Sequence, residues 1–174
     1  MLTLKIIGCI LVIGSCSGIG YYFSCELKAR MEELVQLKKI LMLLRGDIRY
    51  ANTPLAEALN SISVRHNGDF QIFLRWVSGQ LEQMQGKTLA DIWKAGVEHK
   101  LKGVSLTKKD KESLIGFGTN LGYLDKDMQL STIDLYVATI ETEIEEGMRT
   151  LKEKTYLYNS LGVMGGIFIT IVLI

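Results

Sequence analysis

Few side chains in this sequence are of the types that do chemistry, and their spacing does not bring them together. The two histidines, His66 and His99, have no Cys, His or carboxylate at the spacing of metal ligands. Gly116-Phe117-Gly118 lacks the Lys and Ser/Thr of a phosphate-binding loop. No nucleophile stands beside a candidate base. The sequence therefore predicts no catalytic residue, metal site or cofactor; an enzyme with an unrecognised site, tested first at the two histidines, is the alternative.

The three cysteines lie in or beside an apolar N-terminal stretch, at positions Cys9, Cys16 and Cys25. Their spacing matches neither a disulfide framework nor a metal site. Ile13-Gly14-Ser15-Cys16 resembles a bacterial lipobox, so an exported lipoprotein or external scaffold anchored through Cys16 is one alternative for the whole chain. Against it, only Lys5 precedes the apolar run, and basic residues follow it directly.

Four glutamates on the last predicted helix form an acidic cluster: Glu141, Glu143, Glu145 and Glu146. Such a run is typical of a solvated helix face, and a docking patch for a basic partner is the alternative. The two tryptophans, Trp76 and Trp93, are interpreted as core anchors.

Charged side chains are almost absent from both ends of the 174-residue chain. Lys5 is the one charged side chain before Glu26, and none follows Lys154. The apolar runs are each about as long as a helix that crosses a bilayer, roughly 20 residues. We therefore predict transmembrane helices within 1–25 and 155–174, with a helical domain at 26–154 between them. A buried core helix at either end is the alternative.

Basic residues near the predicted spans set the orientation of the chain. They lie on the side of the middle domain, whereas only Lys5 lies on the other side: Lys28, Arg30, Lys38, Lys39, Arg149, Lys152 and Lys154. The positive-inside bias therefore predicts a cytosolic domain and two external termini. The 19 acidic residues and the 19 basic ones other than Lys5 cancel in the middle domain, which argues against a nucleic-acid partner.

Both predicted spans carry glycines four residues apart, Gly14 with Gly18 and Gly162 with Gly166. This spacing lets helix backbones approach closely in a bilayer, where no hydrophobic force draws helices together. We predict transmembrane helix packing at these four glycines.

The middle domain is predicted to be all-α, a bundle of about six helices. Apolar residues recur at three- and four-residue steps, and strand-like alternation is nearly absent. Helix starts are expected at Thr53 as an N-cap before Pro54, at Asp69, and at the Thr-x-x-Asp capping boxes of Thr88 and Thr107. Breaks are expected at Asn67-Gly68, Gly86, Gly103 and around Gly118–Gly122. The last helix should begin near Asp125 and run into the second span.

Two segments resemble signatures of a known family. They are Asp47–Ala58, with its Thr-Pro-Leu-x-Glu-Ala core, and Phe117–Gly122 followed by Asp125, Gln129 and Ile133. With Trp93 and Tyr158–Gly162 the resemblance covers the whole chain. The family is stage III sporulation protein AB of endospore-forming Firmicutes.

The resemblance implies a fold and partners that the residues alone do not. Family members resemble the six-helix cytoplasmic domains of inner-membrane platform proteins in type II secretion and type IV pilus systems. They act in the channel between mother cell and forespore, and their partner is a secretion-type ATPase, stage III sporulation protein AA. The implied role is a non-enzymatic platform in the mother-cell (outer forespore) membrane that couples this ATPase to other channel membrane proteins. A homo-oligomer is compatible with this role.

The candidate partner-binding residues come from the two signature segments: Pro54, Glu57, Gly118, Leu121, Gly122 and Asp125. The competing interpretation of the glycines is that they permit tight turns or close helix packing.

Overall fold

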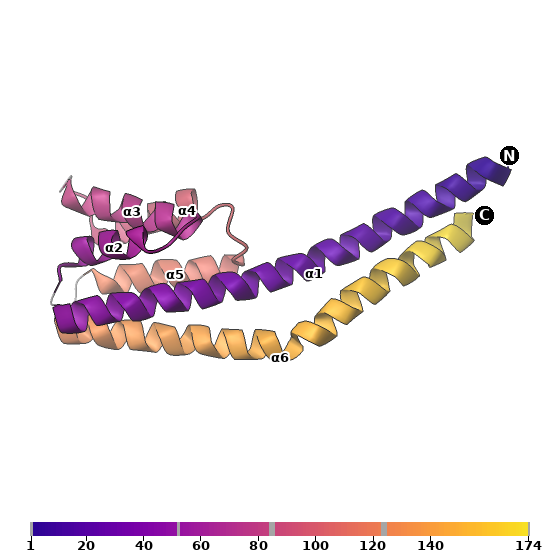
Figure 1. The fold of residues 1–174 in the computed structure, drawn as a ribbon. Helices are drawn as coiled ribbons and strands as arrows, with labels where there is room; N and C mark the ends of the chain where they lie inside the picture. The colour runs from indigo at the N-terminus through magenta and orange to yellow at the C-terminus, as the bar shows by residue number, and fades with distance from the viewer. Residues whose placement is uncertain (1, 52, 84–85, 123–124, 174) are drawn as a thin grey trace. The chain divides into compact units, whose positions relative to one another are not determined.

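A computed structural model gives the fold of residues 2–51, 53–83, 86–122 and 125–173, without the side chains of 2–7, 9, 10, 13, 172 and 173. All regular secondary structure in these residues is helical, with no strand, which confirms the all-α prediction (Figure 1). The elements are α1 (Leu2–Gly46), the π-helical turn η1 (Asp47–Ala51), α2 (Leu55–Val64), α3 (Asp69–Glu82), α4 (Leu89–Lys100), α5 (Lys108–Leu121) and α6 (Lys126–Leu173).

The chain divides into two compact units, and the two long helices contribute to both. Unit 1 consists of Met1–Met31 and Glu145–Ile174, and unit 2 is Glu32–Ile144. Unit 2 therefore contains η1, α2, α3, α4 and α5, together with the C-terminal part of α1 and the N-terminal part of α6.

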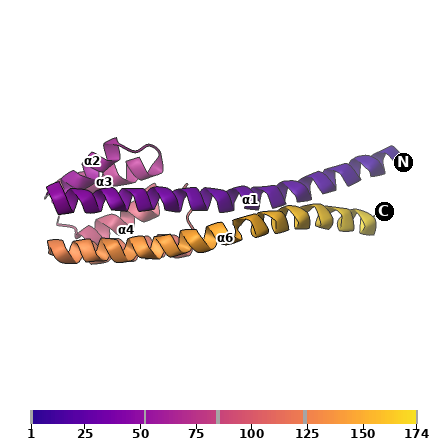
Figure 2. The same cartoon turned by 60° about the horizontal axis from the view of Figure 1, so that its bottom comes forward.

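The core of unit 2 is built from apolar stripes on every helix. On α1 and η1 the buried side chains recur at three- and four-residue steps: Leu34, Leu37, Leu41 and Leu44 on α1 and Ile48 on η1. This spacing keeps one helix face toward the core. Ile133, Tyr136 and Ile140 make the matching stripe on α6. Within unit 2, α1 and α6 run side by side in both views (Figures 1 and 2).

Aromatic side chains connect four helices through this core. Phe73 of α3 meets Trp93 of α4 edge-to-face at 5.0 Å between ring centroids, and Trp93 meets Phe117 of α5 at 5.7 Å. Phe117 stacks on Tyr136 of α6 at 4.8 Å. The indole Nε1 of Trp93 donates to the Leu114 carbonyl at 2.9 Å, so the buried ring leaves no unpaired donor. Trp93 is thus the core anchor expected from the sequence.

Two helix starts follow the sequence closely. Thr88 and Thr107 each accept a hydrogen bond from the backbone N–H three residues later, and the side chains of Asp91 and Asp110 bond back. Both capping boxes are therefore confirmed. The last helix also begins next to Asp125, as predicted, and continues to Leu173.

Two boundaries differ from the prediction. The N-cap of α2 is Pro54, not Thr53, and that of α3 is Gly68, not Asp69. Gly68 has a φ of 81°, a conformation that glycine adopts at no steric cost and aspartate does not. The break expected around Gly118–Gly122 falls at the end of that range, because α5 continues through Gly118 and ends at Leu121.

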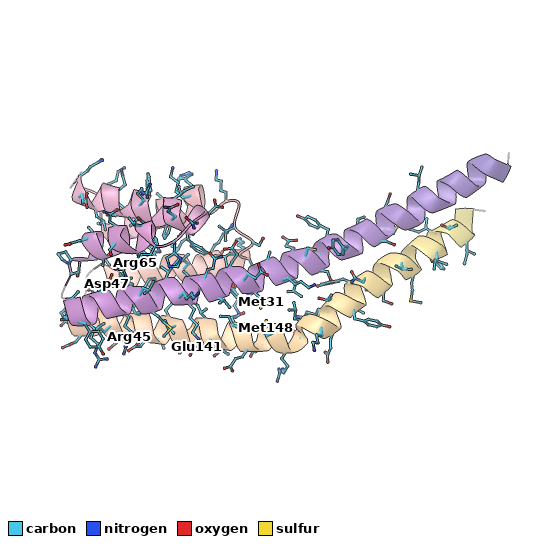
Figure 3. The ribbon with its side chains drawn as sticks, in the orientation of Figure 1. Met31, Arg45, Asp47, Arg65, Glu141 and Met148 are labelled. Atoms are coloured by element: carbon cyan, nitrogen blue, oxygen red, sulfur yellow. The ribbon has the colours of Figure 1, made fainter. Side chains whose placement is uncertain are left out.

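Unit 1 is an antiparallel pair of helix segments whose backbones touch. A Cβ placed on Gly162 would lie 2.7 Å from the Cys16 carbonyl oxygen, and one on Gly20 would collide with the Tyr158 carbonyl. Further along, Gly147 faces the Met31 side chain, and Figure 3 labels Met31 and the neighbouring Met148 on the two helices. The register is constant: contacts that lie further toward the C-terminus of α1 lie equally far toward the N-terminus of α6.

This pairing uses only part of the predicted glycine spacing. Gly162 makes a close approach to α1, while packing within a membrane stays a prediction. Gly14 and Gly18 are exposed, and no described atom lies within 4 Å of a Cβ placed on either. The face of α1 that meets α6 carries Cys16 and Gly20, so the glycines at 14 and 18 point away from the contact. Gly166 is buried.

As far as the helices are described, none has a stretch both long and apolar enough to cross a membrane. The transmembrane helices predicted for 1–25 and 155–174 therefore find no support in the described residues. Small and polar residues such as Ser15, Ser17 and Gly18 dilute the apolar character of the part that is described. The side chains of 1–7, 9, 10, 13 and 172–174 lie outside it.

Candidate functional site

The two signature segments lie at the same end of unit 2. One follows the C-terminal end of α1 and leads into α2, and the other joins α5 to α6 (Figures 1 and 2). Both views place the end of α1 beside the start of α6. Segments that are about 70 residues apart in the sequence thus lie at one end, which we call the signature end, defined by the described residues 47–51, 53–57, 122 and 125–128.

The π-helical turn η1 shapes the first half of this surface. Over Asp47–Ala51 the helix widens, Ile48 stays in the core with 4% of its surface exposed, and Tyr50 is 81% exposed. The Arg49 guanidinium lies 5.6 Å from the Tyr50 ring centroid. Isolated π turns occur frequently at functional sites, and an aromatic ring with an arginine over it is a common composition of binding surfaces. Tyr50 lies within the first signature segment, but the sequence did not mark it as a candidate; its position outside the apolar stripe of α1 was the available signal.

Pro54 and Glu57 lie next along the same surface, and both are exposed. Pro54 precedes the first turn of α2 and its carbonyl accepts from the Ala58 N–H at 3.0 Å. Glu57 lies in that first turn, where a carboxylate favours the helix dipole. Both residues are therefore available to a partner while they also support the start of α2.

The second signature segment divides into a buried and an exposed half. Leu121 has 0% exposure, and Gly118 is buried with its backbone against the indole of Trp93, where a Cβ would collide with the ring. These two residues build the core and are covered in the folded bundle. Partner contact at either position stays a prediction that would require the bundle to open.

Gly122 and Asp125 form the exposed half. Gly122 ends α5 with a φ of −77°, so it needs no special backbone conformation, and a Cβ there would lie 3.0 Å from that of Leu89. The Asp125 carboxylate accepts from the Met128 N–H at 2.9 Å and caps α6. Gln129 donates to the Leu121 carbonyl at 3.3 Å, which ties the end of α5 to the start of α6. Asp125 itself is exposed at the surface.

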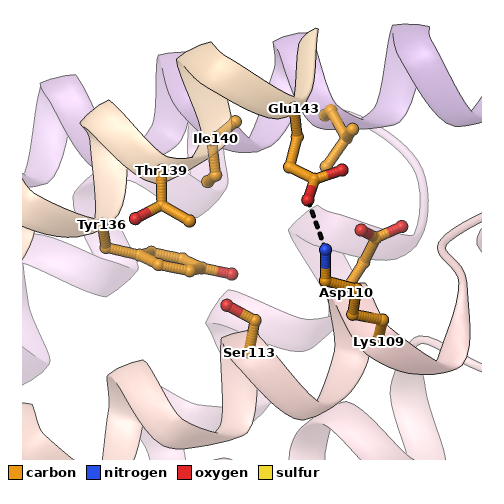
Figure 4. A pocket seen from close by; sticks show the side chains of 8 residues that line it. Lys109, Asp110, Ser113, Tyr136, Thr139, Ile140 and Glu143 are labelled. Atoms are coloured by element: carbon orange, nitrogen blue, oxygen red, sulfur yellow. Dashed lines mark hydrogen bonds and ion pairs between the residues drawn. The ribbon is translucent and has the colours of Figure 1, made fainter. Parts of the chain in front are cut away.

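A small pocket of about 100 Å³ lies between α5 and α6 in unit 2 (Figure 4). It is lined by polar side chains from both helices, among them Lys109, Asp110, Ser113, Tyr136 and Glu143. Pockets that bind small molecules usually measure about 300–1,000 Å³, so this one is too small for an ordinary substrate.

The polar groups of the pocket already have structural partners. Lys109 Nζ and Glu143 Oε1 are 2.7 Å apart, the pair drawn as a dashed line in Figure 4. Asp110 Oδ2 accepts from the Thr107 N–H at 2.9 Å within the capping box. Burial raises the pKa of the Tyr136 phenol, Asp110 adds to this, and a hydrogen bond with Ser113 opposes it. The phenol therefore stays protonated at neutral pH.

A second, wider hollow of about 380 Å³ opens on α3 and α4. Gln71, Ile72, Arg75, Trp76 and Lys100 line it, so its charged lining is wholly basic. Lys100 Nζ lies 5.8 Å from the Trp76 ring centroid. Trp76 is half-buried, unlike Trp93, so the prediction that both tryptophans are core anchors holds for Trp93 and is wrong for Trp76. The Trp76 indole lines the wider hollow instead.

The remaining chemical candidates are not gathered into a site by the part of the chain that the structure describes. There, no three His, Cys, Asp or Glu side chains are grouped to hold a metal ion. His66 follows α2 and His99 lies in the last turn of α4, near helix ends as expected.

The acidic cluster is partly engaged in holding the bundle together. Glu141 pairs with Lys38 of α1 at 2.8 Å, and Glu143 pairs with Lys109 of α5. These ion pairs could not be predicted from the sequence, because the partners lie on other helices and no periodic pattern links them.

Comparison with known proteins gives one consistent result. A family model described as Stage III sporulation protein AB matches residues 5–174. The Stage III sporulation protein AB of Bacillus subtilis (strain 168) is 23% identical over 170 residues, which cover 98% of this chain and 99% of that protein. A solved structure of a Stage III sporulation protein AB aligns with a TM-score of 0.64 at 24% identity, over 71% of this chain and 97% of that one. The structural likeness supports the fold alone.

Proposed function

Because the chain belongs to the stage III sporulation protein AB family, we propose that it is a non-enzymatic membrane platform of the mother cell–forespore channel complex in endospore formation. In this proposal unit 2 is an adaptor on the cytoplasmic side of the mother-cell (outer forespore) membrane. It couples a secretion-type ATPase, stage III sporulation protein AA, to the membrane proteins of the channel. The division into 1–25, 26–154 and 155–174 belongs to the same proposal.

The observation that carries the proposal is the signature end. Two segments that resemble family signatures lie at this end, and each exposes side chains, Tyr50, Pro54 and Glu57 in the first and Asp125 in the second. An exposed aromatic ring with an arginine beside it is typical of a surface that recognises another protein. We assign this surface to the ATPase.

The membrane part of the proposal is supported by the charge distribution of the sequence. The two apolar ends together contain a single lysine, Lys5, and basic residues flank each end on the side of the middle domain. This distribution is typical of a chain anchored at both ends with its domain in the cytosol. Anchoring at both ends would let a conformational change in the ATPase reach the bilayer through α1 and α6, which enter unit 1 without a break in either helix.

Binding of the purified full-length chain to the purified ATPase tests the assignment of the surface. We expect Tyr50→Ala or Glu57→Lys to weaken binding about tenfold or more, because exposed tyrosines at interfaces often dominate affinity. Val64→Ala is the matched control, since Val64 is 69% exposed and lies at the opposite end of α2. Equal affinity for all three variants would reject the signature end, and no binding by the unsubstituted chain would reject the coupling.

Labelling in intact cells tests the topology. Cys9, Cys16 and Cys25 are replaced by Ser, and Lys87→Cys, in the exposed loop before α4, is treated with an impermeant maleimide. We expect labelling only after the membrane is permeabilised. Labelling in intact cells, together with palmitate incorporation at Cys16 in the unsubstituted chain, would establish the lipoprotein alternative instead. Recovery of the chain in the soluble fraction would overturn membrane anchoring.

A further inference from the structure

The wider hollow, on the helices labelled α3 and α4 in Figure 1, has the size of a binding site. Its volume of about 380 Å³ lies within the range of roughly 300–1,000 Å³ that ligand pockets usually occupy. Ile72, Arg75 and Trp76 stand on one side of α3, because residues three and four apart are neighbours on a helix surface. Gln71 and Lys100, the last residue of α4, complete the lining. We call these five residues the Trp76 hollow.

The indole that lines the Trp76 hollow is held in position by α4. A Cβ placed on Gly96 would lie 3.2 Å from Trp76 Cζ3, so the ring lies against the α4 backbone at this glycine. Trp76 is nevertheless only half-buried, and Ile72 beside it is 52% exposed. Tryptophan is enriched among the residues that dominate affinity at interfaces. An apolar group of a ligand would therefore meet a ring that is already fixed and an exposed aliphatic side chain.

The two cations of the Trp76 hollow make no ion pair with a carboxylate in the part of the chain that the structure describes. Arg75 is exposed. Lys100 Nζ lies 5.8 Å from the Trp76 ring centroid, a cation–π distance, and this attraction keeps the ammonium group at the hollow. The guanidinium and the ammonium group are therefore both available to an anion.

Carboxylates on the same two helices stand away from these cations. Glu98 precedes Lys100 by two residues, which is about 200° around α4. Asp69 Oδ2 lies instead near Gly103, 3.1 Å from a Cβ placed there. Glu82 is seven residues beyond Arg75, about 10 Å along α3. The positive charge of the lining is thus not cancelled at the hollow, and charge complementarity favours an anionic ligand.

We propose that the Trp76 hollow binds a segment of a partner protein in which an acidic residue stands next to an apolar one. The carboxylate of this segment binds Arg75 and Lys100. The apolar side chain contacts Ile72 and the Trp76 indole. The Gln71 amide can bond to the peptide backbone, because it offers both donors and an acceptor.

The lining selects an acidic peptide over other anions. Inorganic phosphate would engage only the cations and leave the indole uncovered. A bilayer presents a broad surface, whereas a hollow on two helices takes in a single side chain. Nucleic acid is recognised by rows of cations along its phosphates, and this hollow has two cations on a chain whose net charge is +1. A peptide that carries both a carboxylate and an apolar side chain uses every part of the lining.

The Trp76 hollow is separate from the signature end. A Cβ placed on Gly122, at the signature end, would lie 3.0 Å from the Cβ of Leu89, the first residue of α4. Lys100 ends the same helix about 16 Å further along its axis. The hollow is therefore a second docking site, and it does not rest on the assignment of the signature end to the ATPase.

Peptide titration of the full-length chain in detergent tests the proposal. The probes are two acetylated and amidated hexapeptides, Glu-Leu-Asp-Phe-Glu-Leu and Glu-Asp-Leu-Phe-Glu-Leu, followed by tryptophan fluorescence and calorimetry. Since Trp93 is buried in the core, we expect the change in emission to come from Trp76 and to be lost in Trp76→Phe. Raising NaCl from about 0.05 to 0.5 M should weaken binding several-fold, because salt screens exposed charges.

Charge reversal tests the role of the cations. Arg75→Glu should weaken binding of the acidic peptides about tenfold or more, because it sets a carboxylate against theirs. Lys94→Glu is the matched control: Lys94 is also exposed on α4 but lies about 240° around the helix from Lys100, so affinity should not change. The double variant Arg75→Glu with Lys100→Glu should bind Lys-Leu-Lys-Phe-Lys-Leu instead. Circular dichroism of each variant controls for folding.

Three outcomes would overturn the proposal. The first is that neither acidic hexapeptide binds at about 1 mM, including the case in which inorganic phosphate or phosphatidylglycerol vesicles bind in their place. The second is equal weakening by Arg75→Glu and Lys94→Glu, which would mean general attraction to the whole chain. The third is equally tight binding of Glu-Ser-Asp-Ser-Glu-Ser, which would leave the indole without a role. Because these tests contain no ATPase, their result is independent of the proposed function.

Discussion

Glycine is used in opposite ways by the two units. In unit 1, Gly20 and Gly162 let one helix backbone rest on another, and the paired segments bury few large side chains. In unit 2, Gly96 and Gly118 let aromatic rings rest on a helix: a Cβ on Gly96 would lie 2.8 Å from Phe73 Cε2, and one on Gly118 would collide with Trp93. Backbone contact suits a pair of helices with little to bury, whereas ring contact lets helices cross closely around a dense core.

The difference indicates where stability resides. Of the buried hydrophobic residues, Met31 alone belongs to unit 1 among those described, and the others belong to unit 2. Since apolar burial dominates folding free energy, unit 2 should set the unfolding transition, while unit 1 should respond to substitution without moving it.

The largest effect is expected at the contact between Trp93 and Gly118. Trp93→Ala should lower the free energy of unfolding by about 3–5 kcal/mol, and Gly118→Ala by about 1–3 kcal/mol, because the added methyl group forces the ring aside. With Trp93→Ala already present, Gly118→Ala should cost almost nothing, since the ring is absent. Denaturant unfolding followed by circular dichroism measures all four states of this cycle.

Gly116→Ala is the control for that cycle. It lies in the same helix, and no described atom comes within 4 Å of a Cβ there, so it should stabilise the chain by up to about 1 kcal/mol. A Gly118→Ala variant as stable as Gly116→Ala would show that the ring does not need the glycine.

A smaller effect is expected from Tyr136 at alkaline pH. Burial raises the pKa of this phenol above its ordinary 10.0, so the folded state keeps a proton that the unfolded state loses. Its contribution to stability is therefore complete below pH 10 and declines as the pH rises further, by at most about 1.4 kcal/mol per pH unit. Tyr136→Phe should flatten the stability curve above pH 10, as measured by denaturant unfolding across that range.

Gly20→Leu is expected to have the smallest effect on unfolding, namely no change in the transition. It should separate the helices of unit 1 and reduce disulfide formation between Ser24→Cys and Thr155→Cys about tenfold, which corresponds to roughly 1.4 kcal/mol. The unfolding transition of unit 2 should not move. Gly18→Leu, on the exposed side of α1, should leave both measurements unchanged. A shift in the unfolding transition would mean that the two units fold as one.

Local signals in the sequence predicted local structure well. The capping boxes at Thr88 and Thr107 were recognisable because both partners of each hydrogen bond lie within four residues. The sequence left two interpretations of Gly118 and Gly122 open, because a glycine that ends a helix and one that seats an aromatic ring look alike until the ring is located; Gly122 ends α5 and Gly118 seats Trp93. Likewise, the π turn at Asp47–Ala51 follows an unbroken helical pattern, and nothing in its composition marks the extra residue.

The arrangement of the helices could not be predicted from these patterns. Whether Arg45 meets Asp134 or another carboxylate depends on which helices become neighbours, and the apolar stripes are equally compatible with several orders. The signature end shows the same limit: resemblance selected Pro54 and Glu57, but only the fold shows that Leu121 lies inside and Tyr50 outside.

The pairing of α1 with α6 also has a consequence in time. Arg45 and Asp134 are 89 residues apart, and a ribosome adds roughly 5–20 residues each second, so about 4–18 s pass between the synthesis of the two. During that interval Leu41 and Leu44 have no α6 to cover them. The nascent chain therefore exposes the apolar face of α1 until α6 has been synthesised. A translational pause within 46–133 should prolong this exposure and increase the dependence of folding on chaperones.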